Sequence, residues 1–194
     1  MIDNIEKILP FLVFESADDF YYLQILQRKK ENPQIGSNSR VIKNYYINSQ
    51  EYLLNHYDEI KQLCNQFNAR ASIRLNKRSY ESVAFKTLEN IANSMRNREY
   101  KFIKASYDRA CGLGHSDSEK KWILDIDEPY EFEKYSELIV DIGHIEPMGM
   151  KHLNVIESKS GYHLITKPFN LEKFKNNYPK IEIHKDNPTN LYIP

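Results

Sequence analysis

The chain has 194 residues, of which 41% are hydrophobic and 28% charged, and a formal net charge of zero. This composition is typical of a folded globular protein and excludes a disordered chain. Zero net charge excludes a strong overall positive field, so binding to nucleic acid would have to depend on local clusters of Lys and Arg. The two cysteines, Cys64 and Cys111, form no zinc-site or disulfide pattern, and the sequence has neither an apolar membrane span nor a signal peptide. These features predict a cytoplasmic protein.

The first half of the chain predicts helices that alternate with strands. A short helix and an extended segment are expected over residues 1–16. A helix is predicted over residues 16–30, because Ser16 can cap it and the acids Asp18 and Asp19 would lie in its first turn. The basic residues 28–30 would then lie at its C-terminus, where positive charge is stabilising. Further strands are predicted at 40–48 and 69–75, and further helices at 49–67 and 79–97.

The second half predicts a buried strand followed by a second group of strands. Residues 111–115, Cys-Gly-Leu-Gly-His, predict a flexible loop, and the polar residues 116–121 lead into an apolar strand at 122–128. A tight turn after residue 159 would join two further strands. The remaining predicted elements are a helix at 130–142, strands at 153–159 and 161–166, a short helix at 171–178, a strand at 181–184 and an edge strand at 190–193.

Two carboxylates follow the apolar residues of the strand at 122–128. Alternate side chains of a strand share a face, so Asp125 and Asp127 would stand side by side with Ile126 on the opposite face. Two close carboxylates raise each other's pKa unless a cation lies between them. Mg²⁺ commonly takes one or two carboxylates together with substrate phosphates, so the pattern predicts metal-assisted phosphoryl transfer. The alternative is a buried strand whose polar end leads into a turn.

Downstream residues could complete such a site. The turn Ser160-Gly161-Tyr162-His163, preceded by Lys159, offers a hydroxyl, backbone N–H groups and an imidazole to phosphate oxygens. The alternative is an ordinary hairpin with a structural histidine. Asp186 follows a predicted strand and would supply a third carboxylate, for which Glu182 competes.

Two arginines could contribute positive charge to the same site. Arg70 and Arg74 lie four residues apart on one predicted strand and therefore on one face. They would form either a basic floor for phosphates or template backbone, or two surface salt bridges.

Three of these elements resemble, in order and rough spacing, the motifs of the archaeo-eukaryotic primase superfamily, the primase-polymerases. They are Leu124-Asp125-Ile126-Asp127, Ser160-Gly161-Tyr162-His163 and Asp186, and the resemblance covers about residues 70–194. It implies a template-directed nucleotidyltransferase, a DNA primase or primase-polymerase that makes primers from NTPs or dNTPs on single-stranded DNA. The zinc knuckle and helicase domain of many relatives are missing. This would fit a minimal catalytic domain that works with a separate helicase, as in a phage or mobile element.

The resemblance also implies roles for individual residues. Two Mg²⁺ or Mn²⁺ ions would be held by the three acids Asp125, Asp127 and Asp186. The triphosphate of the incoming nucleotide would be bound by His163, Ser160 and Lys159. Arg70 and Arg74 would lie near the nucleotide or template, which follows from their position and not from the family pattern.

The predicted fold class is α/β of the α+β kind, with a mixed sheet of ferredoxin or RNA-recognition type in a catalytic module at 70–194. An αβ module at 1–69 would precede it and pack with it into one domain. Two other functions stay open. Glu157-Ser158-Lys159 is similar to the metal site of restriction-endonuclease-like nucleases, and a non-catalytic nucleic-acid-binding replication module would use the acids structurally.

Overall fold

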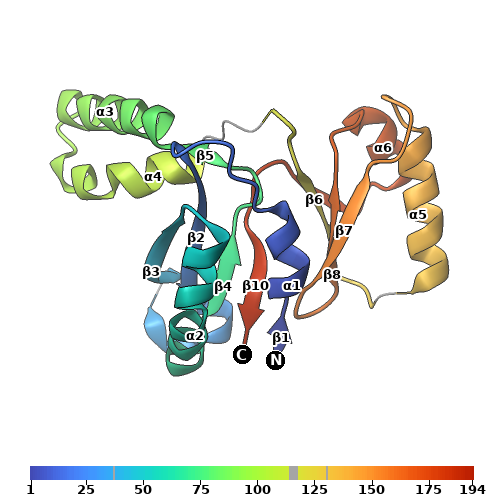
Figure 1. The fold of residues 1–194 in the computed structure, drawn as a ribbon, viewed down its shortest axis with the longest axis horizontal. Helices are drawn as coiled ribbons and strands as arrows, with labels where there is room; N and C mark the ends of the chain where they lie inside the picture. Colours follow the sequence, from blue (N-terminus) through green and yellow to red (C-terminus); the bar gives the residue numbers. More distant parts are fainter. Residues whose placement is uncertain (37, 114–117, 130) are drawn as a thin grey trace.

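The chain folds into two antiparallel sheets that lie side by side, with helices packed around them (Figure 1). The computed structural model describes residues 1–36, 38–113, 118–129 and 131–194. Within these ranges the protein is an α+β fold with six helices. They are α1 (Ile5–Ile8), α2 (Gln50–Phe67), α3 (Tyr80–Arg96), α4 (Ser106–Leu113), α5 (Phe132–His144) and α6 (Leu171–Asn177). None of the helices in the described ranges is long and apolar enough to cross a membrane.

Each sheet brings together strands that are distant in the sequence. The first has the order β1 (Ile2–Asp3), β10 (Thr189–Ile193), β4 (Arg70–Ile73), β2 (Asp19–Gln27), β3 (Arg40–Ile47), with β5 (Arg78–Ser79) also paired to β2. The second has the order β7 (His152–Glu157), β8 (Tyr162–Thr166), β6 (Trp122–Ile126), β9 (Glu182–His184). All pairings are antiparallel.

The helix predicted over residues 16–30 is wrong, because this segment contains the central strand β2. Its run of aromatic and branched residues is buried on both faces, which removes the polar side that an amphipathic helix would show. The supposed capping signal forms a turn instead, in which the Asp19 carboxylate accepts backbone N–H bonds from Glu15 at 2.8 Å and Ser16 at 3.2 Å. The basic residues 28–30 therefore lead into a 3-10 turn, Lys29–Glu31, and not out of a helix.

The expected mixed sheet is wrong as well, because the strand pairings of the described residues are antiparallel. The crossover from β3 through α2 to β4 does run between parallel strands, but β2 inserts between them and pairs antiparallel with both. Strand β10 was expected at an edge and instead lies between β1 and β4, with all of its residues buried.

Predictions that rested on local signals are confirmed. Ser49 caps α2 by accepting the N–H of Tyr52 at 2.9 Å, and Ser79 caps α3 by accepting that of Ser82 at 3.1 Å. The strands predicted around β3, β4, β6, β7, β8 and β9 are present, as is the short helix α6. The loop expected at 111–115 is wrong for residues 111–113, which belong to α4. Residues 114–117, and Tyr130 at the start of the helix predicted over 130–142, lie outside the described residues.

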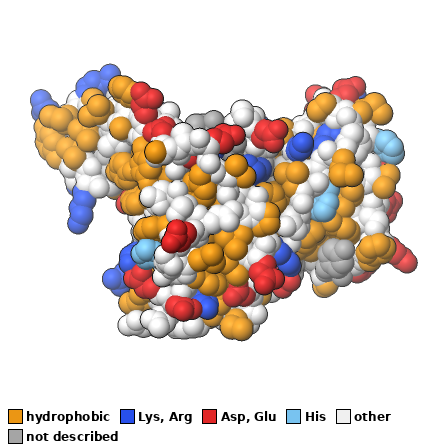
Figure 2. All heavy atoms as spheres, in the orientation of Figure 1, with side chains coloured by type: hydrophobic (Ala, Val, Ile, Leu, Met, Phe, Trp, Pro, Cys, Tyr) orange, Lys and Arg blue, Asp and Glu red, His pale blue; other side chains and the backbone are white. Residues whose placement is uncertain are grey.

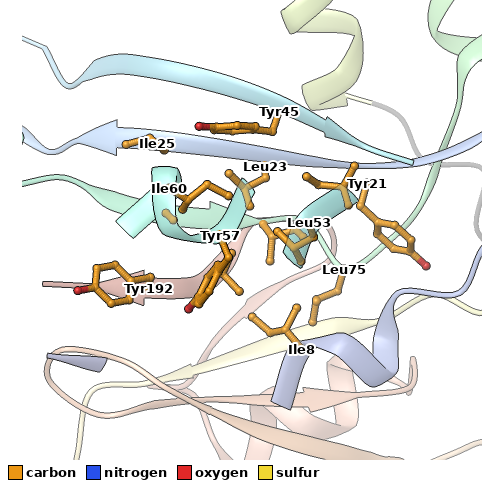
Figure 3. Packing of buried hydrophobic residues seen from close by; sticks show 14 of the residues in the cluster. Ile8, Tyr21, Leu23, Ile25, Tyr45, Leu53, Tyr57, Ile60, Leu75 and Tyr192 are labelled. Atoms are coloured by element: carbon orange, nitrogen blue, oxygen red, sulfur yellow. The ribbon is translucent and has the colours of Figure 1, made fainter. Parts of the chain in front are cut away.

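The largest core joins the two sheets. Leu53 and Ile60 of α2 pack onto Leu23 and Tyr45 of the first sheet, as Figure 3 shows, and Ile8 of α1 lies below them. The same cluster includes Ile123, Ile156 and Ile165 from the second sheet. A separate cluster between the second sheet, α5 and α6 covers the outer face of that sheet. The predicted boundary between residues 69 and 70 stays a prediction. The first sheet contains strands from both sides of this boundary, because β4 and β10 pair with strands that precede residue 70.

Two asparagines that are each 1% exposed connect the sheets. The Asn4 amide donates to the carbonyls of Glu157 and Asn190, both at 3.1 Å, and so bridges β7 and β10. The Asn76 side chain bonds to the backbone of Lys121 before β6, to the carbonyl of Lys185 after β9, and to the Asp186 carboxylate.

Helices α3 and α4 extend to one side of the molecule (Figure 1), and their inner residues Val83, Ala110 and Cys111 pack on Phe20 and Tyr22 of β2. Hydrophobic side chains gather on these two helices, as Figure 2 shows, and those of Phe85, Leu88 and Met95 on α3 are largely exposed.

Candidate active site

A cleft of about 840 Å³ lies between the two sheets. One wall comes from the first sheet and the turn after β2, and includes Arg28, Arg70 and Asn190. The opposite wall comes from the second sheet and its β7–β8 turn, and includes Asp125 and His163. The cleft therefore brings a basic surface to face a carboxylate-bearing one.

Asp125 lies in the middle of the second sheet's cleft face. It is paired in register with His163 of β8 on one side and with Glu182 of β9 on the other. His163 Nε2 is 3.4 Å from Asp125 Oδ1, and His184 Nε2 is 3.9 Å from Oδ2. The hydrogen bond with His163 holds the pKa of the Asp125 carboxyl below its usual value, so this group is a carboxylate at neutral pH.

His163 is held in place from the other sheet. Its Nδ1 lies 2.7 Å from the hydroxyl of Thr189, a fully buried residue of β10. A Thr189 hydroxyl that donates to Nδ1 leaves Nε2, the nitrogen that faces Asp125, to carry the ring proton. The packing of the two sheets thus orients the imidazole.

Asp127 also lines the cleft, but it lies just after β6, which ends at Ile126 and not at residue 128 as predicted. Its Oδ1 accepts a hydrogen bond from the Ser160 hydroxyl at 2.9 Å, so the β7–β8 turn touches the end of β6. Glycine is required at position 161, because a Cβ there would run into the backbone carbonyl of Ile126. The turn and the carboxylate pair therefore form one structural unit.

The cations of the cleft are partly neutralised by Glu31. Its carboxylate accepts from Arg70 Nε at 2.9 Å and lies 3.2 Å from Lys159 Nζ, which connects the two walls. Burial would raise the pKa of the Glu31 carboxyl, but the bonds from Arg70 and Lys159 outweigh it and lower that pKa. Arg70, predicted as part of a basic floor, is thus in the cleft but already has an anionic partner.

Asp186 and Arg74 are not brought to the cleft. The Asp186 carboxylate accepts from the fully buried Arg78 at 2.6 and 3.0 Å, and lies 3.7 Å from Arg74 Nη1. Arg74 also donates to the Asp186 backbone carbonyl. Asp186 therefore acts as the counter-ion of two arginines, and of the two acids that competed for the third position only Glu182 shares the face of Asp125.

Two carboxylates of the cleft offer oxygen ligands to a hard cation. Carboxylates of Asp125 and Asp127, completed by substrate oxygens, are what Mg²⁺ prefers. Over the described ranges, no group of three or more His, Cys, Asp and Glu side chains is arranged to hold a metal ion by itself. Asp125 and Asp127 would therefore need oxygen ligands from a bound molecule to complete the coordination of such an ion.

Sequence reasoning missed three residues of this site. The alternation Glu182-Ile183-His184 was a usable signal for His184, since it places that ring on the face of Glu182 and Asp125. Thr189 and Glu31 gave no signal, because their roles depend on contacts between segments that are distant in sequence. Comparison with protein-family models, curated proteins and solved structures finds no match for this chain.

Proposed function

We propose that the chain is a metal-dependent nucleotidyltransferase of the primase-polymerase type, which joins nucleotides on a single-stranded DNA template. One observation carries the proposal: Asp125, Asp127, Ser160 and His163 converge in a single cleft whose opposite wall is basic. This combination suits phosphoryl transfer, in which a metal held by carboxylates and nearby cations together balance the charge of a triphosphate.

The residues of the chain have distinct roles in this proposal. Asp125 and Asp127 would hold Mg²⁺ or Mn²⁺, which supplies Lewis-acid stabilisation of phosphate oxygens. His163, oriented by Thr189, donates from Nε2 to a phosphate oxygen or to Asp125. Lys159 binds phosphate once it is released from Glu31.

The assignments of a second metal ligand and of a protein partner have less support than the roles of Asp125 and Asp127. Glu182 is the acid that could add a ligand beside Asp125, since Asp186 is occupied by Arg78. A separate helicase as partner is inferred from the family resemblance alone.

The nuclease alternative has weaker support from the geometry. Glu157 of the Glu-x-Lys pattern does not line the cleft, and its carboxylate pairs with Lys7 of α1 at 2.8 Å. Its side chain is 61% exposed, away from Asp125 and Asp127. A metal site that combines these residues would need the β7 edge to rearrange.

The test is incorporation of labelled NTPs or dNTPs on single-stranded DNA with Mg²⁺ or Mn²⁺. Wild type should extend or start strands, and Asp125→Asn and Asp127→Asn should each abolish incorporation while remaining folded. Asp58→Asn is the matched control, because this acid of α2 has an 88% exposed side chain far from the cleft. Glu157→Gln should retain activity.

Other outcomes would select a different function. Degradation of the DNA that is lost in Glu157→Gln would support the nuclease. DNA binding without any turnover, unchanged in both aspartate variants, would support the non-catalytic module.

A further inference from the structure

A row of uncharged polar side chains crosses the first sheet. The strand registers align Asn44 of β3 with Gln24 of β2, Gln24 with Ser72 of β4, and Ser72 with Asn190 of β10. Side chains that are directly paired in neighbouring strands share a face, so these four form one continuous line, called here the polar row. At the usual strand spacing it extends over about 14 Å.

The polar row lies on the face that α2 does not cover. The neighbouring row on the opposite face consists of Tyr45, Leu23 and Ile73, which are buried under α2 (Figure 3). Asn44, Gln24 and Ser72 are half-buried. Ser72 and Asn190 line the cleft, whereas Gln24 and Asn44 continue the row beyond it, beside Tyr22 and Tyr46, on which α3 and α4 pack.

The polar row retains hydrogen-bonding capacity. The Gln24 amide donates to the Tyr22 hydroxyl at 3.0 Å and to Asn44 Oδ1 at 3.1 Å, which orders this end of the row. Within the described residues, the Ser72 hydroxyl and the Asn190 side-chain amide bond to no protein group, yet neither is sealed from solvent. Ser72 and Asn190 line the cleft itself, so the row leads to Asp125.

We propose that the polar row is the track on which a single strand of nucleic acid lies as it enters the cleft. This inference rests on the proposed function and extends it by assigning the strand to a surface. Neutral donors and acceptors match base edges and sugars, which only an unpaired strand presents freely to a sheet. Arg28 and Lys30 at the cleft provide local positive charge for phosphates.

The charge of the protein favours a single strand over a duplex. With a formal net charge of zero, the chain lacks the general positive field that duplex binding through many phosphates requires. Binding by a few cations together with hydrogen bonds to bases suits a short single strand. DNA and RNA share this chemistry, so the test compares both sugars.

The test measures binding of labelled oligo-dT and oligo-rU by fluorescence anisotropy without nucleotide and without divalent metal. Asn44→Ala/Ser72→Ala should weaken binding by about tenfold or more, since each lost hydrogen bond accounts for about fivefold. The matched control is Asn55→Ala/Gln62→Ala, which removes two exposed polar side chains of α2 behind the sheet. This control should bind within about twofold of wild type, a change smaller than one lost hydrogen bond.

A second variant keeps the test valid if the double variant folds poorly. Asn44→Asp is nearly isosteric and should weaken binding by charge repulsion, whereas Asn55→Asp should not. The proposal is overturned if row variants bind like wild type, if wild type prefers duplex, or if it binds no single strand. Because no nucleotide is present, a wild type that binds along the row but incorporates nothing would refute the catalytic proposal alone.

Discussion

The variant Asp186→Asn tests whether the Asp186 carboxylate has a structural role or binds a metal. Arg78 is fully buried, and its only anionic partner among the described residues is Asp186, at 2.6 and 3.0 Å. The other acceptors of this guanidinium are the backbone carbonyls of Asn76 and Cys111. Neutralising Asp186 would leave a buried positive charge with neutral partners only.

The expected loss is large. Removing one partner of a buried ion pair typically costs about 3–5 kcal/mol in the free energy of unfolding. With an m-value of about 2 kcal/mol/M in urea, the unfolding midpoint of Asp186→Asn should fall by about 1.5–2.5 M. Arg74, 3.7 Å from the same carboxylate, would lose its counter-ion as well.

The assay combines urea unfolding, followed by circular dichroism, with nucleotide incorporation by the folded fraction at low temperature. Glu182→Gln is the comparison, because the Glu182 side chain is 75% exposed and its removal should leave the urea midpoint unchanged. Replacing both buried partners, in Arg78→Met/Asp186→Leu, should recover much of the lost stability.

One combination of results would contradict a structural role for Asp186. If Asp186→Asn keeps the wild-type urea midpoint but loses all incorporation, Asp186 is a catalytic carboxylate, and the ion pair with Arg78 is not the main role of this group.

Three further results are expected. Gly161→Ala should lower the thermal stability by about 1–3 kcal/mol, because a Cβ meets the carbonyl of Ile126 and displaces the turn. Thr189→Val should cost about 1 kcal/mol in urea unfolding and reduce incorporation, because His163 Nδ1 loses its partner. The folded-state pKa of Asp125 lies below its unfolded value, so the stabilisation by this group is present above about pH 4 and is lost as the pH falls through the folded pKa. Acid unfolding should therefore be less steep in Asp125→Asn than in wild type.

Each of these predictions has a control. A Cβ at Gly143 in α5 would make only ordinary van der Waals contact, so Gly143→Ala should not destabilise the protein, and equal losses at 143 and 161 would contradict the packing argument. Thr189→Ser retains the hydroxyl and should keep activity near that of wild type. Identical acid unfolding of Asp125→Asn and wild type would show that His163 does not stabilise the carboxylate.

Local chemistry explains most of the successful sequence predictions. Ser49 and Ser79 cap helices through bonds to residues three positions away, and the alternation that turns Asp125 to one face and Leu124 and Ile126 to the other is a property of one strand. These signals need no knowledge of the rest of the fold. The segment 19–27 was misassigned because burial on both faces leaves no period to read.

Long-range contacts explain what the sequence could not reveal. Asp186 follows a strand, as a third metal ligand would, but it is paired with Arg78, 108 positions earlier in the chain. His163 is oriented by Thr189, which reaches it only because β10 is inserted into the first sheet. The sequence named candidate residues for a site, but only the packing of the two sheets decides which of them meet.

The two buried asparagines that connect the sheets restrict how the cleft can open. Asn4 bridges β7 and β10, and Asn76 holds the segments that enter β6 and leave β9. Both side chains are buried and bonded to backbone atoms of the two sheets, so sliding of one sheet along the other would break hydrogen bonds at two separate places. The cleft therefore has walls whose relative position is fixed by buried amides and not only by the contacts of its own lining.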